Sequence, residues 1–415
     1  MGCVCRVAFA PLAWGGVYDV KDYGAKGDGV TKDTAAIQRA IDAAEAAGGG
    51  TVEVPAGRYL TGSIFLKDNI DLHVGAGAVL FGSPDRADYN APDVCAQNWS
   101  SKYENASGGH LILAIEKRNV TVRGPGLVDG NSAAFLLDPK TGDNWPEIHR
   151  GIPWRTSQMM YFVECEGVRV EDLRIENSPY WSCFLHGCRK AQLRGLQVRT
   201  PRKPRTWNGD GIDIDCCQDV TISDCIIETD DDCITLRGDP KLLKRKQDCA
   251  RITVANCVLS SVCNAVRIGV GDGVVRDATF SNLVVHDTKT AFHLVSGYSK
   301  GRGTDISNVR FENIQADCRV FCRVRHGFAT GARIGNVTFS GVSGRTTDAS
   351  IVWANSARPF GRIVFDGVNL EGPGVEVVSA PDVRFVDSSL APISFSDAER
   401  MQRVSDVDAC RVNLW

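Results

Sequence analysis

The 415-residue chain has 43% hydrophobic residues and 42 glycines but only 4 methionines, which is typical of a β-rich globular protein with many tight turns. Its net charge of −3 is too small to indicate a nucleic-acid partner, and no apolar run approaches the roughly 20 residues of a membrane-spanning helix. No proline-rich or serine-rich linker and no block of like charge divides the chain. We therefore expect a single domain over 18–415, preceded by an N-terminal extension over 1–17.

The beginning of the chain is expected to close one end of the fold. Residues 1–17 have an apolar character but neither a charged leading region nor a convincing cleavage site, so we predict no signal peptide. Asp33 is a plausible N-cap for a helix over about 33–47, which carries apolar side chains on one face and ends at the glycines of 48–50. Because only short strands follow, we expect this helix to cap an open stack of strands.

The 16 cysteines occupy positions that indicate buried apolar side chains. Cys165, Cys188, Cys217 and Cys249 each stand three residues before an alternating apolar segment, which predicts a ladder of free, buried thiols on successive repeats. No cysteine pair or Cys/His cluster has the spacing of a metal site, so we expect no metal and no other cofactor. Free thiols are compatible with a reducing compartment, and the location of the protein stays open.

Alternating apolar triplets recur along the chain with spacings of 20 to 32 residues. Strand repeats of this length without intervening helices predict a parallel β-helix, in which each coil stacks its strands on those of the coil before. A leucine-rich repeat is disfavoured because its leucine pattern is missing, and a propeller because no Trp-Asp signature recurs at blade length. The triplets begin at Val168, Ala191, Val220, Ile252, Ala278, Val309, Val337, Ile363 and Val383.

The stretch 208–237 gathers carboxylates at both of its ends, with short β-branched strands between them. Stacked strands lie about 4.8 Å apart, so carboxylates on neighbouring coils would repel each other and one of them would keep its proton. A protonated acid beside an ionised carboxylate is what hydrolysis of a glycosidic bond requires. Turn-forming aspartates and a Ca²⁺ site are two other interpretations of the same residues. Alignment of the coils gives one column of Asp210, Asp232, Asn264 and Thr290, and a next outward column of Asp213, Thr235, Arg267 and His293.

Several segments resemble, in the same order, those of the polygalacturonases, the pectin-cleaving family 28 of glycoside hydrolases: GAKGDGVTKDTAAIQRAI, LKDNIDLHVGAGAVLFGSPDRADY, GPGLVDGN and ENSPYW. The resemblance implies an all-β fold, a single-stranded right-handed parallel β-helix. The family's Asn-x-Asp motif matches Asn208 to Asp210, and its Asp-Asp pair matches Asp231 and Asp232. By this match Asp231 would be the general acid, while Asp210 and Asp232 would activate water for inversion at the anomeric carbon.

Two motifs depart from the family pattern at positions expected to bind substrate. The family's histidine is replaced by Asn264, and its Arg-Ile-Lys segment falls on His293 to Val295, which lacks both cations. The resemblance therefore implies a divergent member, with a pectin-like acidic substrate that need not be plain polygalacturonan. Nearby groups are candidates to replace the missing contacts by charge-assisted hydrogen bonds. The predicted substrate-binding residues are Asn208, Asn264, Arg267, His293, Arg302 and Lys203.

These observations predict an inverting glycoside hydrolase that cleaves a pectin-like acidic poly- or oligosaccharide, without a nucleic-acid or membrane partner. One alternative is a Ca²⁺-dependent polysaccharide lyase on the same scaffold. The other is a non-catalytic carbohydrate-binding β-helix. The family resemblance suggests a secreted or periplasmic protein, whereas the free cysteines and the missing signal peptide leave a cytoplasmic location open. The exact sugar, attack within the chain or at its end, and the oligomeric state are left open by the sequence.

Overall fold

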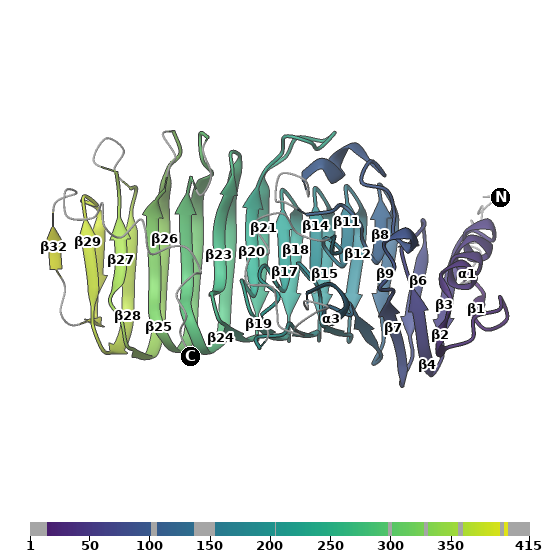
Figure 1. The fold of residues 1–415 in the computed structure, drawn as a ribbon. Helices are drawn as coiled ribbons and strands as arrows, with labels where there is room; N and C mark the ends of the chain where they lie inside the picture. Colours follow the sequence, from purple (N-terminus) through teal and green to yellow (C-terminus); the bar gives the residue numbers. More distant parts are fainter. Residues whose placement is uncertain are drawn as a thin grey trace, which may run out of the picture.

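Strands with alternating apolar side chains stack in register here because each coil repeats the pattern of the coil before it. The computed structural model describes residues 15–100, 106–136, 154–203, 205–297, 301–327, 331–355, 360–390 and 394–396. Within these ranges the chain winds into a parallel β-helix, and Figure 1 shows its strands side by side along the length of the molecule. Each coil contributes strands to three sheets in turn, which we number 1 to 3. The boundaries predicted for the domain and its N-terminal extension stay a prediction, because residues 1–14 lie outside the described ranges.

Sheet 1 carries the candidate site. Its strands are β5 (Ile64–Phe65), β8 (Ile112–Ile115), β11 (Met160–Val163), β14 (Cys183–His186), β17 (Ile212–Asp215), β20 (Ile234–Gly238), β23 (Asn264–Gly271), β27 (Ser350–Trp353), β29 (Val375–Val378) and β32 (Ser394–Ser396). Two long strands, β24 (Val274–Ser296) and β25 (Asp305–His326), pass through all three sheets and fill the places in sheet 1 between β23 and β27.

The other two sheets complete each coil. Sheet 2 contains β1 (Val17–Asp19), β3 (Gly50–Val54), β6 (Ile70–Val74), β9 (Arg118–Arg123), β12 (Glu166–Glu171), β15 (Arg189–Arg194), β18 (Gln218–Ser223), β21 (Cys249–Ala255) and β30 (Val383–Val386). Sheet 3 contains β2 (Asp28–Lys32), β4 (Gly57–Thr61), β7 (Ala78–Gly82), β10 (Leu127–Asp129), β13 (Arg174–Glu176), β16 (Gln197–Arg199), β19 (Ile226–Thr229), β22 (Val258–Ser261) and β31 (Ser389–Leu390). Strands β26 (Ile334–Thr346) and β28 (Ile363–Glu371) contribute to both.

The predicted repeat is confirmed by the pairing of sheet 2. Ala191 pairs with Val220, Val220 with Ile252, and Ile252 with Ala278, and the same register continues to Val383. At the turn after this triplet, Asn256, Asn282 and Asn313 of three successive coils adopt positive φ. Asn256 donates its side-chain amide to the Asp224 carboxylate of the coil before, while Asn282 and Asn313 each donate to the asparagine of the coil before. The turn is therefore repeated as strictly as the strands are.

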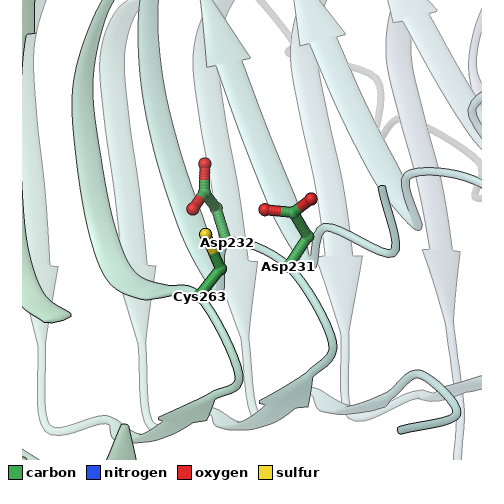
Figure 2. A group of neighbouring side chains, drawn as sticks. All are labelled: Asp231, Asp232 and Cys263. Carbon is green, nitrogen blue, oxygen red and sulfur yellow. The ribbon is translucent and has the colours of Figure 1, made fainter. Parts of the chain in front are cut away.

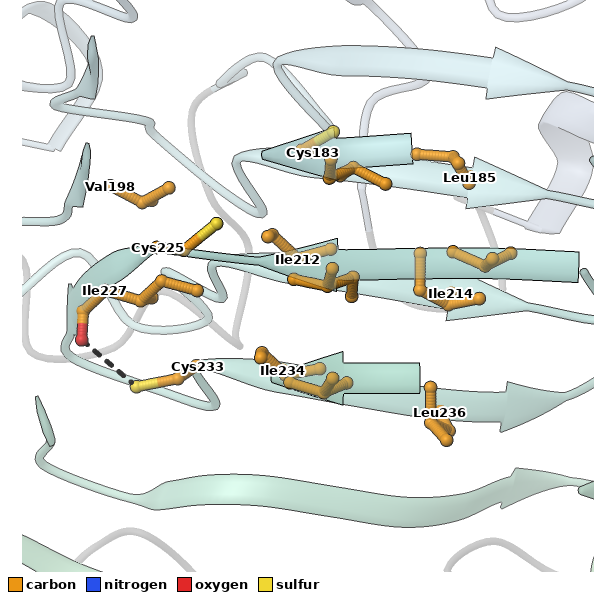
Figure 3. Packing of buried hydrophobic residues seen from close by; sticks show 14 of the residues in the cluster. Cys183, Leu185, Val198, Ile212, Ile214, Cys225, Ile227, Cys233, Ile234 and Leu236 are labelled. Atoms are coloured by element: carbon orange, nitrogen blue, oxygen red, sulfur yellow. Dashed lines mark hydrogen bonds between the residues drawn. The ribbon is translucent and has the colours of Figure 1, made fainter. Parts of the chain in front are cut away.

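The inside of the coil is apolar and contains the predicted cysteine ladder. All described cysteines are free, and all of them except Cys95 are buried. Cys217 illustrates how a thiol fits this interior, because its sulfur accepts the backbone N–H of Cys188 on the coil before at 3.2 Å. Figure 3 shows the aliphatic layers beside these thiols, such as Ile212 and Ile234, which stack across adjacent coils. The core thus fixes the strands of sheet 1 in one register.

The predicted N-terminal helix is α1 (Thr34–Ala46), and it covers the first coil with the apolar face of Ile37, Ala40, Ile41 and Ala44. Asp33 is its N-cap residue, but its carboxylate does not bind the first turn of the helix. It accepts the N–H groups of Lys26 and Gly27 instead, which ties the glycine-rich turn to the cap. The other described helices are short: η1 (Arg86–Asp88), η2 (Ala96–Asn98) and α3 (Ala133–Leu136). No described helix is long and apolar enough to cross a membrane.

Candidate active site

Three adjacent strands of sheet 1 place the candidate carboxylates in one row. Ile212 of β17 pairs with Ile234 of β20, which pairs with Val266 of β23. The residues two positions earlier are Asp210, Asp232 and Asn264, so they lie at the same level where the chain enters these strands. Backbone hydrogen bonds continue the stack at this level, because Gly211 donates to the Asp232 carbonyl and Cys233 donates to the Asn264 carbonyl. The register that the sequence predicted is present.

Asp232 is the most tightly held carboxylate of the row. It is 1% exposed, and one of its oxygens accepts the side-chain amide of Asn264 at 2.5 Å. Its other oxygen lies 3.2 Å from a guanidinium nitrogen of Arg267. A planar guanidinium and an amide that approach the two oxygens separately fix the orientation of the carboxylate. Asp232 is therefore positioned to act on a group that meets it from outside the coil.

Asp210 is buried beside three other carboxyl groups. Burial raises the pKa of Asp210 well above its ordinary value, and the charges of Asp213, Asp231 and Asp232 raise it further, while Arg267 opposes the rise. The cluster thus retains a proton that an isolated aspartate would lose, as the sequence reasoning expected of stacked carboxylates. The raised pKa is that of Asp210, whereas the family resemblance assigns the acid role to Asp231. In a cluster this close the retained proton belongs to the whole group of carboxylates.

Asp231 is partly exposed, in contrast to its buried neighbours Asp210 and Asp232. Its backbone carbonyl accepts the hydroxyl of Thr229 at 2.6 Å and the hydroxyl of Ser261, which fixes the tip of the turn. Figure 2 shows its carboxylate beside that of Asp232, with Cys263 of the next coil below them. Of the three predicted catalytic residues, Asp231 is thus the one that solvent and a substrate can reach most easily.

Asp230 has a structural role that the sequence reasoning did not assign to it. Its buried carboxylate accepts the hydroxyl of Thr206 at 2.8 Å and the N–H groups of Trp207 and Gly209 at 2.7 and 2.9 Å. A Cβ at Gly209 would lie only 2.2 Å from a carboxylate oxygen of Asp230, so a glycine is required at that position. Asp230 therefore holds the loop that carries Asp210 against the neighbouring coil.

Arg155 is a second residue that sequence reasoning missed. This buried guanidinium donates to the carbonyls of Pro179, Thr206 and Trp207 and to the side-chain oxygen of Asn208, the last at 3.2 Å. It fixes Asn208, which has a φ of 68° and was predicted to bind substrate. No local pattern marks Arg155, because the carbonyls that it binds come from other coils.

The remaining predicted binding residues lie at different distances from the row. His293 pairs in register with Arg267, and burial lowers its pKa well below the ordinary value, with the charge of Arg267 lowering it further. Lys203 is exposed on the loop before Asn208. Arg302 is bound to Asp305 and to the carbonyl of Asp272, at the opposite end of the sheet 1 strands from the carboxylates. The structure thus places His293 and Arg267 together and gives Arg302 local partners.

Two cations in the same sheet were not singled out from the sequence. Arg323 of β25 pairs with His293, and Arg325 pairs with Val295. Two cations at the spacing of those missing from 293–295 are thus present one coil later, both as arginines. Extending the predicted columns by one more repeat would have found it.

The carboxylate pair and its neighbouring thiol form a group that could hold a metal ion. Ligand atoms of Asp231, Asp232 and Cys263 all lie within 4.8 Å of one another. Calcium takes six to eight oxygen ligands, and a thiol is not among its preferred donors. This donor set therefore does not favour the Ca²⁺ site that a lyase would use, and would suit a thiophilic ion better.

Stacked parallel coils with a carboxylate cluster on their outer side define a β-helix protein with an acid-lined site. The family model for glycosyl hydrolases family 28 matches residues 50–389, and the chain belongs to this family. A probable polygalacturonase from Vitis vinifera is 25% identical over 289 residues, which cover 68% of this chain and 57% of the relative. An exo-poly-alpha-D-galacturonosidase from Dickeya chrysanthemi is 28% identical over 268 residues, which cover 56% of this chain and 44% of the relative. The chain thus spans about half the length of these curated relatives.

A solved structure extends the comparison to the fold. The family 28 exopolygalacturonase from Yersinia enterocolitica superimposes with a TM-score of 0.70 at 21% identity, covering 93% of this chain and 78% of that chain. This likeness confirms the predicted fold class, a right-handed parallel β-helix with a small helical cap.

Proposed function

We propose that the chain is an inverting glycoside hydrolase that cleaves a pectin-like acidic poly- or oligosaccharide. The observation that carries the proposal is the cluster of Asp210, Asp231 and Asp232 on adjacent coils, two of them buried and one within reach of solvent. The relatives named as a polygalacturonase and a galacturonosidase support a substrate of this class. Chemistry and family membership therefore point to the same reaction.

The geometry is compatible with different catalytic roles for the three carboxyl groups. Asp231, which is partly exposed, protonates the glycosidic oxygen as the sugar leaves. Ligand atoms of Asp231 and Asp232 lie within 4.8 Å, which leaves little room for a water between these two residues alone. The attacking water is then held by Asp232 together with Asp210 on the coil before. Arg267 and Asn264 keep the Asp232 carboxylate aligned for this step.

The substrate-binding assignments rest on charge and position. Arg267 and His293 lie next to each other in sheet 1, directly beyond the carboxylates, where an acidic sugar would need a compensating group. Asn264 and Asn208 flank the carboxylates on the two neighbouring turns and can bind sugar hydroxyls. Lys203 and Arg302 are more distant and would meet outer parts of a bound chain.

The test is a screen of reducing-end release across pectic and non-pectic glycans, followed by the Asp231→Asn variant. A hydrolase releases new reducing ends from at least one acidic glycan, and Asp231→Asn loses turnover by roughly 10² to 10⁴-fold while it still binds the ligand. Asp224→Asn, which changes an exposed turn aspartate of the same coil, is the matched control and should keep full activity.

The two alternatives give different results in the same screen. A lyase would produce an unsaturated product that absorbs ultraviolet light, and its activity would disappear with a Ca²⁺ chelator. A purely binding β-helix would retain ligand without releasing any product. Either outcome would overturn the proposed function.

A further inference from the structure

One row of side chains on the outer face of sheet 1 runs past the candidate active site, with one residue from each coil. Tyr161 pairs with Phe184, Phe184 with Asp213, Asp213 with Thr235 and Thr235 with Arg267, and the register continues for four more coils. Because successive side chains of a strand point to opposite faces, this row lies outside the core to which Ile212 and Ile214 belong. We call these residues the outer row: Tyr161, Phe184, Asp213, Thr235, Arg267, His293, Arg323, Ile351 and Glu376.

The outer row changes from buried to exposed at the carboxylates. Tyr161, Phe184, Asp213 and Thr235 are at most 1% exposed, although none of them belongs to the interior of the coil. From Arg267 onward the row is partly exposed, with His293 at 6% as the exception. Side chains on the outside of a sheet become inaccessible only when other segments cover them. The N-terminal half of the row is therefore closed and the C-terminal half is open.

The cover over the closed half is an aromatic layer that the described parts of one connecting segment, 83–100 and 106–110, hold in place. Tyr161, Trp181 and Phe184 form a separate hydrophobic cluster, against which Cys95 and Ala106 pack from that segment. His110 stacks on Tyr161 with ring centroids 4.6 Å apart. A substrate cannot lie along this part of the sheet without displacing several packed rings.

A second segment, 239–248, secures the same cover from the other end of the strands. The carboxylate of Glu164 accepts the N–H groups of Lys244 and Arg245 at 3.0 and 2.7 Å, and it also binds the side chain of Gln97. Glu164 thus joins the two covering segments at a single point. At the edge of the site, the Arg237 guanidinium lies 4.6 Å from the centre of the Trp181 ring. The cover therefore reaches the coil that carries Asp232.

The open half of the row is positively charged next to the site, and the acidic Glu376 stands only at its far end. Arg267 and Arg323 of the row, and Arg325 two residues further along β25, are all partly exposed. Arg267 and Arg323 flank His293, whose buried Nε2 has no hydrogen-bond partner in the described part of the chain. A buried polar atom without a partner is unfavourable unless a ligand or water meets it. Carboxylate groups of a polysaccharide match this surface in charge and in hydrogen-bonding capacity.

We infer that an acidic polysaccharide extends from the active site only toward the C-terminal coils, so that the enzyme removes short units from a chain end. On the closed side the aromatic cover leaves room for very few sugar residues. On the open side, Arg267, Arg323 and Arg325 hold the carboxylates of the polymer. The inference rests on the proposed function and adds to it the mode of attack and the direction of binding.

The test follows the products formed from a long galacturonan or another acidic glycan that the screen shows to be cleaved. Cleavage at the end releases mono- or disaccharides from the earliest time point, and viscosity falls little while reducing ends accumulate. A rapid fall in viscosity with a ladder of intermediate oligomers would overturn the inference while leaving the proposed function intact. No turnover on any glycan would instead overturn the proposed function, and the inference with it.

Two variants test the closed and the open side separately. Trp181→Ala removes a ring from the cover and should lengthen the shortest products, whereas Ile226→Ala, which trims an exposed side chain of sheet 3, should not. Arg323→Gln should raise KM for long acidic chains by roughly 10-fold, the loss expected for one charge-assisted hydrogen bond. Arg345→Gln, an exposed arginine of β26, is its control. An unchanged KM for Arg323→Gln would contradict binding along the C-terminal coils. This test of the open side remains valid even if Trp181→Ala fails to fold.

Discussion

The guanidinium of Arg267 lies 3.2 Å from the carboxylate of Asp232 on the preceding coil, and both side chains are largely buried. The pair joins the carboxylate cluster to the cationic half of sheet 1. Removal of one partner leaves the other charge buried without compensation, which is more costly than loss of an exposed ion pair.

Arg267→Gln is therefore expected to destabilise the protein by about 3 to 5 kcal/mol, measured as the free energy of unfolding in urea. The control is Arg251→Gln, which breaks the exposed pair with Asp219 and should cost less than about 1 kcal/mol. Adding Asp232→Asn to Arg267→Gln should recover part of the loss, because the uncompensated charge is then gone. Equal destabilisation by the two single arginine variants would show that the buried pair contributes no more than a surface one.

Asp210→Asn should abolish turnover and yet stabilise the protein at neutral pH. Burial raises the pKa of Asp210, so the folded state binds a proton that the unfolded state releases above about pH 3.8. Stability is then lost as pH rises from that value through the raised pKa, at a cost of about 1.4 kcal/mol for each unit by which the pKa is raised. The asparagine variant has no such loss. Urea unfolding at several pH values measures the free energy of unfolding of the parent and the variant, with Asp224→Asn as the control. An Asp210→Asn protein that is less stable than the parent at pH 7 would contradict the prediction.

Acid should loosen the cover over the closed half of the outer row. Burial lowers the pKa of His110 to about 4, against the opposing hydrogen bond to the Gln158 carbonyl. The unfolded state therefore binds more protons, and stability that is complete above pH 6.5 is lost as pH falls toward 4, by about 1.4 kcal/mol per pH unit. His110→Asn should make the pH dependence of the free energy of unfolding shallower, by an amount that corresponds to at most one bound proton. The partly exposed His286→Gln is the matched control, and an unchanged slope for His110→Asn would refute the assignment.

The stereochemistry of the product tests the role given to Asp210. If Asp210 and Asp232 jointly hold the attacking water, the first product seen by proton NMR has the anomeric configuration opposite to that of the cleaved bond. Retention would mean that one carboxylate attacks the sugar directly. In that case a covalent intermediate should accumulate with an activated substrate, and inversion would have to be withdrawn from the proposed function.

The repeat, and with it the rows of side chains that the repeat creates, could be predicted from the sequence alone. Apolar triplets from Val168 to Val383 predicted the stacking of coils, and their register placed Asp210 level with Asp232 and Arg267 beside His293. This was possible because side chains alternate strictly along a strand and each coil copies the previous one. Extending the same columns by one repeat would also have given Arg323.

The roles of the three consecutive aspartates, one of which fixes the loop while another is exposed, depend on contacts between distant segments and could not be predicted from the sequence. Asp230 is tied to Thr206 and Gly209, whereas Asp231 faces outward, and nothing in the tripeptide distinguishes them. The closure of the outer row likewise depends on Glu164, which receives hydrogen bonds from segments about 67 and 81 residues away in sequence. Loops of irregular length have no period, so their contacts follow from how the finished coils bring distant segments together.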